Sequence, residues 1–285
     1  MPSLNSPPAS VALAGVEIVA ARNPLLTRIA TGLVLIAVAL TAVWLGGIAF
    51  AALVAAGTLV MFSEWAVMQR LGRGVRVAGL ALIAGVILLL SLVSVGEALM
   101  TLAAGAGLLG LFAARLRKGW GFWTAAGVLY CGLPAVALIW LRGLPLGLAA
   151  TVFVLVAVWA TDIAAFFAGR AIGGAKLAPS ISPNKTWAGA FGGVIGAMAI
   201  TGGMAAWYLA QQGGIKAGYF IGLAGALAVL SILGDLFESW MKRRAGVKDS
   251  GTILPGHGGV LDRLDGLVPV AIAGACVFAV TGWAG

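Results

Sequence analysis

The chain has 285 residues, of which 61% are hydrophobic and only 9% are charged, and its mean hydropathy is +1.07. Because a soluble globular chain normally carries about 25% charged residues, this composition excludes a soluble protein and predicts an integral membrane protein. The net charge of +9 is typical of basic loops on one face of a bilayer, so we expect no nucleic acid among its partners.

The expected fold class is all-α, a polytopic transmembrane helical bundle. About 20 apolar residues cross the hydrocarbon layer as a helix, and the chain lacks the period-2 alternation of an outer-membrane barrel. Residues 1–28 are predicted to form an N-terminal tail with a short interfacial helix. They make a poor signal peptide, because Glu17 interrupts the apolar region and no basic residue precedes Arg22.

About nine spans follow, each bounded by charge, glycine or proline. They are predicted at about 29–46, 48–66, 77–94, 97–114, 121–141, 147–169, 187–210, 217–240 and 264–283. We divide them into N-terminal transmembrane helices, residues 29–146, and a catalytic transmembrane region, residues 147–285, with long loops at 170–186 and 241–263.

The basic residues lie almost entirely on one side of these spans. Only Arg142 and Lys216, of the eighteen Lys and Arg residues, fall on the other side. The positive-inside rule therefore predicts a multi-pass protein of the cell (inner) membrane, with its N-terminus and both long loops in the cytoplasm and its C-terminus external.

Asp162 and Asp235 are acids that lie inside predicted spans, near their cytoplasmic ends. A carboxylate inside a membrane costs several kcal/mol, on the order of 3 or more, so such a residue is a candidate for function. Asp235 is followed by Glu238, Ser239 and Lys242 at i+3, i+4 and i+7, a spacing that places all four on one helical face. This polar face is expected to line a cavity.

The charged segment that follows ends with Asp262, Arg263 and Asp265, at the entrance of the last span. Both carboxylates share a helical face because they are three residues apart. Oxygen ligands without a Cys and His set favour Mg²⁺, which commonly bridges carboxylates and substrate phosphates. We therefore predict a metal centre of Asp235, Asp262 and Asp265.

A glycine-rich turn, residues 255–259, lies within the same segment and contains the single histidine, His257. Gly258 and Gly259 allow backbone N–H groups to approach phosphate oxygens closely. We expect His257 to contact phosphate or metal. Nearby basic residues are candidates to balance phosphate charge: Lys176, Lys185, Lys242, Arg243, Lys248 and Arg263.

Residues 239–265, hereafter the signature segment, resemble the signature of the phosphatidate cytidylyltransferase (CDP-diacylglycerol synthase) family. The matching residues are Ser239, Met241, Lys242, Arg243, Lys248, Asp249, Gly251, Leu254, Pro255, His257, Gly258, Gly259, Val260, Asp262, Arg263, Leu264 and Asp265. The region around the loop 170–186 is also similar to the family, at Asp162, Gly169, Arg170, Lys176, Leu177, Ala178, Pro179, Ser182, Pro183, Lys185, Thr186 and Trp187. Asn184 and Ala188 depart from the family pattern.

The resemblance implies a homodimeric membrane enzyme that condenses CTP with phosphatidate and requires Mg²⁺; a second, monovalent cation is left open. It implies that the basic residues and Ser182 bind phosphates, and that Gly258 and Gly259 hold the leaving pyrophosphate. Asp249 and Asp162 either support the metal ligands or contact the nucleotide, and Ser239 belongs to the substrate-binding set.

Two other classes of protein were weighed. A CDP-alcohol phosphatidyltransferase is disfavoured because the chain has no array of four Asp spread along two helices in the spacing typical of those enzymes. The main alternative is an anionic-solute membrane transporter, whose polar residues would be spread along a path through several helices. Here the polar residues are confined to the cytoplasmic end of the predicted spans.

Overall fold

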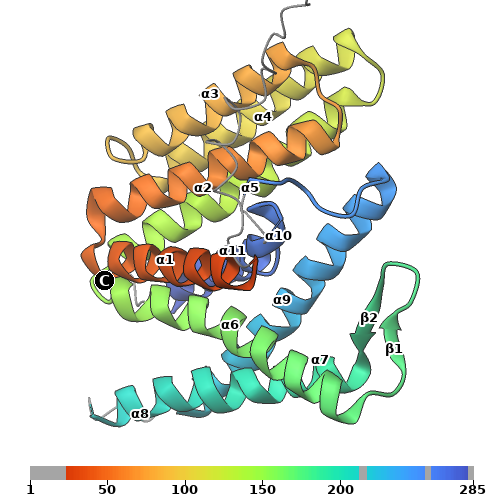
Figure 1. The fold of residues 1–285 in the computed structure, drawn as a ribbon. Helices are drawn as coiled ribbons and strands as arrows, with labels where there is room; N and C mark the ends of the chain where they lie inside the picture. The colour runs from red at the N-terminus through yellow and green to blue at the C-terminus, as the bar shows by residue number, and fades with distance from the viewer. Residues whose placement is uncertain (1–23, 212–216, 254–257, 282–285) are drawn as a thin grey trace, which may run out of the picture.

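The structure is a computed structural model that describes residues 24–211, 217–253 and 258–281 (Figure 1). His257 and nearly all of the tail expected over residues 1–28 therefore lie outside the described residues. The described chain is mostly helical, as expected. Its helices are α1 Pro24–Leu45, α2 Gly47–Met68, α3 Arg73–Leu89, α4 Val95–Leu116, α5 Trp120–Gly143, α6 Gly147–Ile172, α7 Trp187–Ala197, the π-helix η1 Met198–Gly202, α8 Gly203–Gln211, α9 Ala217–Ala245, α10 Leu261–Leu264 and α11 Leu267–Val280.

Six helical segments of the described chain are long and apolar enough to cross a membrane. They are α2, α4, α5, α6, the continuous run Trp187–Gln211 formed by α7, η1 and α8, and α9 from Gly218. The other three predicted spans are also helices, but shorter: 17 residues for α3, and apolar stretches Gly32–Leu45 and Leu267–Val280 in α1 and α11. The structure thus shows six candidate spans, and a nine-span topology remains a prediction.

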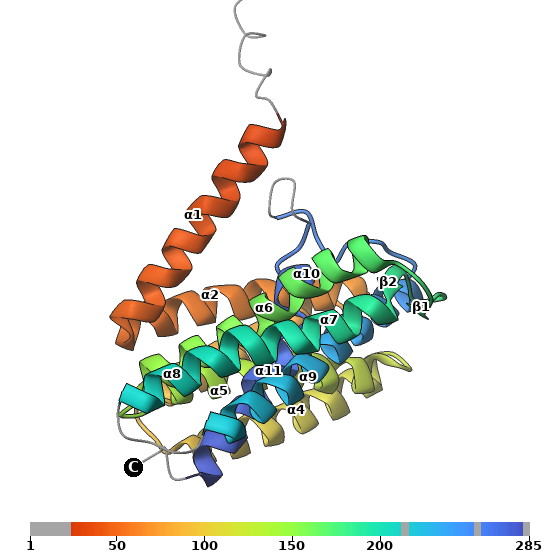
Figure 2. The same cartoon turned by 90° about the horizontal axis from the view of Figure 1, so that it is seen from below.

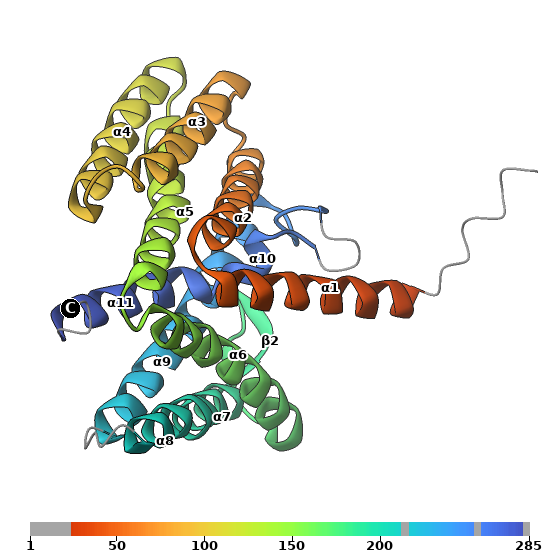
Figure 3. The same cartoon turned by 90° about the vertical axis from the view of Figure 1, so that its left-hand side faces the viewer.

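The helices pack into two groups that share α5, α9 and α11. One hydrophobic core joins α2 to α5 and includes Phe62, Trp65 and Leu102. A second core joins α5 and α6 to α9 and α11 and includes Val154 and Leu227. Figure 3 shows α11 between the two groups, with α2–α5 on one side and α6–α9 on the other. α1 runs away from the bundle at an angle (Figure 2).

The loop predicted at 170–186 contains a β-hairpin that the all-α expectation did not include. Strand β1, Lys176–Ala178, pairs antiparallel with β2, Ser182–Thr186, and Lys176 lies opposite Thr186. The hairpin leads directly into α7, because the hydroxyl of Thr186 accepts a hydrogen bond of 3.1 Å from the N–H of Gly189 and caps the helix. The hairpin is thereby held at the ends of α6 and α7.

The second predicted loop is shorter than expected, because α9 continues to Ala245. Lys242 and Arg243 are therefore helical, and the connection to α10 begins at Gly246. Two buried side chains beside this connection, Met241 and Leu261, belong to the core of the α2–α5 group. The signature segment is thus packed against the N-terminal helices as well as joined to the C-terminal ones.

Candidate active site

The polar face predicted on α9 is present and is held by a lysine from the hairpin. The Lys185 ammonium forms an ion pair with the carboxylate of Asp235, although the two residues are 50 positions apart in sequence. The Ser239 hydroxyl lies 3.4 Å from the other Asp235 oxygen. β2 and α9 are thus joined through predicted site residues.

One turn further along α9, Lys242 joins two carboxylates. Its Nζ lies 2.7 Å from Glu238 Oε2 and 2.9 Å from Asp262 Oδ1. The side chain of Glu238 is fully buried, and that of Asp262 is only 8% exposed. A buried charge is tolerated only when it is paired, so Lys242 is the group that allows both acids to lie at the α9–α10 junction.

Asp262 also organises the backbone of the signature segment. Its carboxylate accepts hydrogen bonds from the N–H of Ser250, at 3.0 and 3.1 Å, and from the N–H of Gly259, at 2.9 Å. Burial by itself raises the pKa of Asp262, but hydrogen bonds with Glu238, Lys242 and these backbone N–H groups lower it to about 2. Asp262 is therefore an anion at neutral pH.

Glu64, a residue of α2 that the sequence analysis missed, holds the same segment from the opposite side. Its carboxylate accepts hydrogen bonds from the N–H groups of Val260 and Leu261, at 3.0 and 2.8 Å, and from the hydroxyl of Ser250 at 3.2 Å. Its exposed fraction is 4%. A signal for it exists in the sequence, because Glu64 is an acid inside the predicted span 48–66 and an acid there needs a partner.

The contact between Glu64 and the segment requires glycine at position 259. A Cβ on Gly259 would lie 2.1 Å from the Ser250 hydroxyl and 2.7 Å from a Glu64 oxygen, both far inside van der Waals contact. The preceding Gly258 has a φ of +82°, which L side chains rarely adopt. Gly258 and Gly259 are thus required by the backbone conformation and by the packing against Glu64, whether or not they also bind phosphate.

Asp265 lies beside α9 and forms an electrostatic cluster with two other acids. α9 passes so closely that a Cβ on Gly234 would lie 2.5 Å from the Asp265 carbonyl oxygen. The Asp265 carboxylate accepts a hydrogen bond of 2.8 Å from the N–H of Gly266. It experiences the charges of Asp235 and Asp162, which Lys185 partly offsets. Acids from α6, α9 and the α10–α11 junction therefore act on one another here.

The remaining predicted residues are less closely engaged. Arg243 donates from Nε to the Ile181 carbonyl at 3.3 Å and so ties α9 to the tip of the hairpin, next to Ser182. Lys176, Lys248 and Asp249 are exposed. The exposed side chain of Arg263 extends from α10. Within the residues that the structure describes, Lys176, Lys248 and Asp249 form no ion pair with the carboxylates described above.

The donor chemistry of this site suits a hard divalent cation. Asp162, Asp235 and Asp265 act on one another electrostatically, and Lys185, the ion-pair partner of Asp235, offsets only part of their charge, which leaves a negative excess that Mg²⁺ would balance. Within the described residues, however, no three His, Cys, Asp or Glu side chains already converge at metal-binding positions. Asp262 is engaged instead by Lys242 and two backbone N–H groups.

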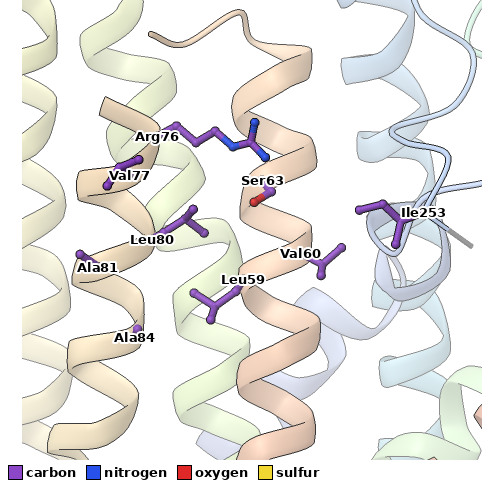
Figure 4. Close-up of a pocket in the computed structure, with 9 residues that line it drawn as sticks. All are labelled: Leu59, Val60, Ser63, Arg76, Val77, Leu80, Ala81, Ala84 and Ile253. Carbon is purple, nitrogen blue, oxygen red and sulfur yellow. The ribbon is translucent and has the colours of Figure 1, made fainter. Parts of the chain in front are cut away.

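Two surface grooves flank α2, and neither is lined by the predicted acids. The larger, about 520 Å³, lies between α2 and α3 and is apolar except for Arg76 and Ser63, with Ile253 of the signature segment on one wall (Figure 4). The smaller groove, about 300 Å³, lies where the ends of α2, α4 and α9 meet.

Comparison with known proteins matches the chain to one family. Residues 26–281 match the model of the cytidylyltransferase family. A phosphatidate cytidylyltransferase of Brucella melitensis is 45% identical over 254 residues, which cover 86% of this chain and 90% of the relative. A phosphatidate cytidylyltransferase of Pseudomonas aeruginosa is 36% identical over 274 residues, which cover 90% of this chain and 97% of the relative.

Proposed function

The chain belongs to the phosphatidate cytidylyltransferase family, and we propose that the acids and lysines joined by α6, the hairpin, α9 and α10 form its active site. The enzyme transfers the cytidylyl group of CTP to phosphatidate and releases CDP-diacylglycerol and pyrophosphate. A phosphate oxygen of phosphatidate bonds to the α-phosphorus of CTP, and the bond between that phosphorus and the β-phosphate oxygen breaks. Neither the family match nor the relatives support an anionic-solute transporter.

One observation carries this placement of the site. Asp162, Asp235, Asp265 and Lys185, the ion-pair partner of Asp235, come from four separate segments of the chain and act on one another. Buried acids that repel one another reduce stability. Their assembly in an otherwise apolar protein is therefore better explained by catalysis than by folding.

The main requirement of the reaction is compensation of the negative charges of the two substrates. The second pKa of a phosphate monoester is about 6, so the phosphatidate phosphate is already largely dianionic at neutral pH and needs no strong general base. The difficulty is that it must approach the polyanionic CTP. We assign Lys185, Lys242 and Arg243 to reducing this repulsion, with Ser182 and Ser239 as hydrogen-bond donors to phosphate oxygens.

We propose that Asp235, Asp262 and Asp265 hold Mg²⁺, for which Asp262 would exchange its contact with Lys242 for the ion, and that Asp162 adds to their negative field. When bound, the ion would neutralise phosphate charge and help to orient the two substrates. Lys176, Lys248, Asp249, His257 and Arg263 remain proposed contacts of the nucleotide or pyrophosphate, and Gly258 and Gly259 are proposed to hold the leaving group.

The orientation and assembly of the protein are part of the proposal. Sixteen of the eighteen Lys and Arg residues lie on the side of the active site, which supports a cytoplasmic site that CTP can reach and a nine-span topology. We also propose a homodimer, consistent with the apolar surface of α1 away from the bundle, where Val34 and Trp44 are 61% and 71% exposed. Light scattering of the purified protein should give about twice the chain mass of 28.7 kDa after correction for detergent; a single-chain mass would contradict the dimer.

The function and the site are tested together by transfer of label from α-³²P CTP into chloroform-extractable lipid. Label should enter lipid only when phosphatidate and Mg²⁺ are both present. Asp265→Asn should reduce the rate by a factor of about 100 or more, as expected for loss of a charge that stabilises the transition state. Glu97→Gln, which changes an exposed acid at the start of α4, is the matched control and should keep the wild-type rate. Full activity of a folded Asp265→Asn variant would remove Asp265 from the site.

A further inference from the structure

The smaller groove beside α2 is a basic pocket that the proposed reaction does not use. Its volume is about 300 Å³, and four cations line it: Arg70 from the end of α2, Arg117 and Lys118 from the α4–α5 connection, and Arg244 from the end of α9. Trp120 and Trp123 of α5 complete it. None of these six residues contributes to the active site described above.

The pocket carries four positive charges and no carboxylate. Within the described residues, none of these four cations forms an ion pair with an acid. Cations gathered in one concave surface without counter-charges produce a strong local positive potential. The surface therefore suits an anion that can accept hydrogen bonds from several of these side chains at once.

Two of the arginines are already oriented by aromatic rings. The Arg244 guanidinium lies 4.3 Å from the centroid of the Trp123 ring, and that of Arg117 lies 5.6 Å from the centroid of Trp120. A guanidinium stacked on a ring keeps its N–H groups directed outward in its plane, where they match the oxygens of a phosphate group. Because the rings already restrict these arginine side chains, less side-chain conformational entropy is lost when an anion binds.

The position of the pocket favours a lipid over a soluble anion. Arg117, Lys118 and Gly119 form the short connection between two candidate membrane spans, Val95–Leu116 and Trp120–Gly143, so they lie at the membrane boundary. Tryptophan is enriched at the depth of the lipid headgroups, and basic residues near the membrane surface are attracted to an anionic leaflet. We propose that the basic pocket binds the phosphate headgroup of an anionic phospholipid of the same leaflet.

A lipid in this pocket would contact elements that also hold the active site. Arg244 follows Lys242 by two residues on α9. The carbonyl of Trp123 accepts a hydrogen bond of 2.8 Å from Nε1 of Trp65, the neighbour of Glu64 on α2. A bound headgroup would therefore join α2, α5 and α9 where they support the signature segment, and its binding should raise the temperature of thermal unfolding.

The test measures bound lipid and not catalysis. Purified protein in detergent is titrated with phosphatidylglycerol or with phosphatidylcholine, and the bound lipid is counted by native mass spectrometry. We expect the wild type to prefer phosphatidylglycerol, and Arg117→Gln/Arg244→Gln to bind it about tenfold more weakly, equivalent to about 1.4 kcal/mol. The control pair, Arg73→Gln/Arg115→Gln, changes two exposed arginines outside the pocket and should change the affinity less than twofold.

A second pocket variant, Arg70→Gln/Lys118→Gln, removes two charges without touching the stacked rings and should also weaken phosphatidylglycerol binding. It keeps the test decisive if loss of the stacked arginines unfolds the protein. An equal loss in the control pair, or equal binding of the two lipids, would overturn the proposal. Displacement of the lipid by inorganic pyrophosphate would show that the pocket serves a soluble anion instead. Because no outcome depends on CTP, failure here would leave the proposed function intact.

Discussion

At the scale of single residues, Glu64 has the most specific role outside the family signature. It is buried in α2, and its three hydrogen bonds all go to residues 250–261. Hydrogen bonds to a charged group contribute about 1.5–3 kcal/mol each to stability. Glu64 touches none of the acids of the proposed metal site, so we regard it as a positioning residue that holds the backbone around Gly259 and Asp262.

Glu64→Gln is expected to lower kcat about tenfold or more, because the new amide would direct N–H groups toward backbone N–H groups and displace the segment. The thermal unfolding temperature should fall as well. Steady-state kinetics and a thermal unfolding curve of the purified variant measure both effects. Trypsin cleavage should also increase at the two lysines and two arginines of residues 242–248, since the segment would be held less firmly.

The comparison variant is Glu97→Gln, which changes an exposed glutamate in the first turn of α4. It should leave kcat and the proteolysis pattern as in the wild type. If Glu64→Gln has wild-type kcat, the carboxylate is needed only for folding and the positioning role is wrong.

At the scale of elements, the junction of α9 and α10 rests on Lys242. This lysine lies between a fully buried Glu238 and the nearly buried Asp262, so the two helices are joined by one cation and two carboxyl groups. The hairpin is joined to α9 by the ion pair between Lys185 and Asp235. A hydrogen bond from Arg243 to the Ile181 carbonyl adds a second connection. Ionic contacts thus connect elements whose apolar surfaces face lipid or other helices.

Lys242→Met is expected to destabilise the protein by about 3–5 kcal/mol, because it leaves the nearly buried Asp262 carboxylate without its counter-charge. Adding Glu238→Gln should restore part of that loss, since the amide N–H groups can donate to the Asp262 carboxylate. Thermal or denaturant unfolding of the two variants measures the coupling. Lys248→Met, at an exposed lysine six residues further on, serves as the control. Strictly additive effects of the two substitutions would contradict the ion-pair account.

At the scale of the whole molecule, the distribution of charge predicts how the protein is oriented. The predicted topology places most Lys and Arg residues on the side of the hairpin and the signature segment, whereas the connection between α5 and α6 contains no basic residue beyond Arg142 at the end of α5. The Arg142 side chain is engaged there, because its Nε donates to the Val43 carbonyl at 2.7 Å. The arrangement predicts a cytoplasmic hairpin and an external α5–α6 connection.

Cysteine accessibility tests this orientation and the number of spans. In a Cys276→Ser background, in which the remaining Cys131 is buried, Pro145→Cys and Thr281→Cys should react with a membrane-impermeant maleimide in intact spheroplasts. Ser180→Cys, at the tip of the hairpin, should react only after permeabilisation. All three positions are exposed. Labelling of Ser180→Cys from outside would invert the topology, and protection of Thr281→Cys would contradict an odd number of spans.

The sequence alone was sufficient for the helical membrane fold and for the family. Apolar runs of about 20 residues identify helices that can lie in a membrane. Helical geometry alone places Asp235, Glu238, Ser239 and Lys242 on one face. The contact of Lys242 with Glu238 confirms the shared face. The hairpin was missed because its strands are only three and five residues long and carry no clear alternation of polar and apolar residues.

Tertiary structure alone decided which distant residues meet. Glu64 lies 196 residues before Val260, Lys185 lies 50 before Asp235, and the charge of Asp162 acts on Asp265. Tertiary structure also gave Asp262 its own partners, Lys242 and the backbone N–H groups of Ser250 and Gly259. The physical reason is that periodicity tells which side of a helix is polar, whereas the partner of each polar group depends on how the helices pack, and that is decided by side-chain contacts between remote parts of the chain.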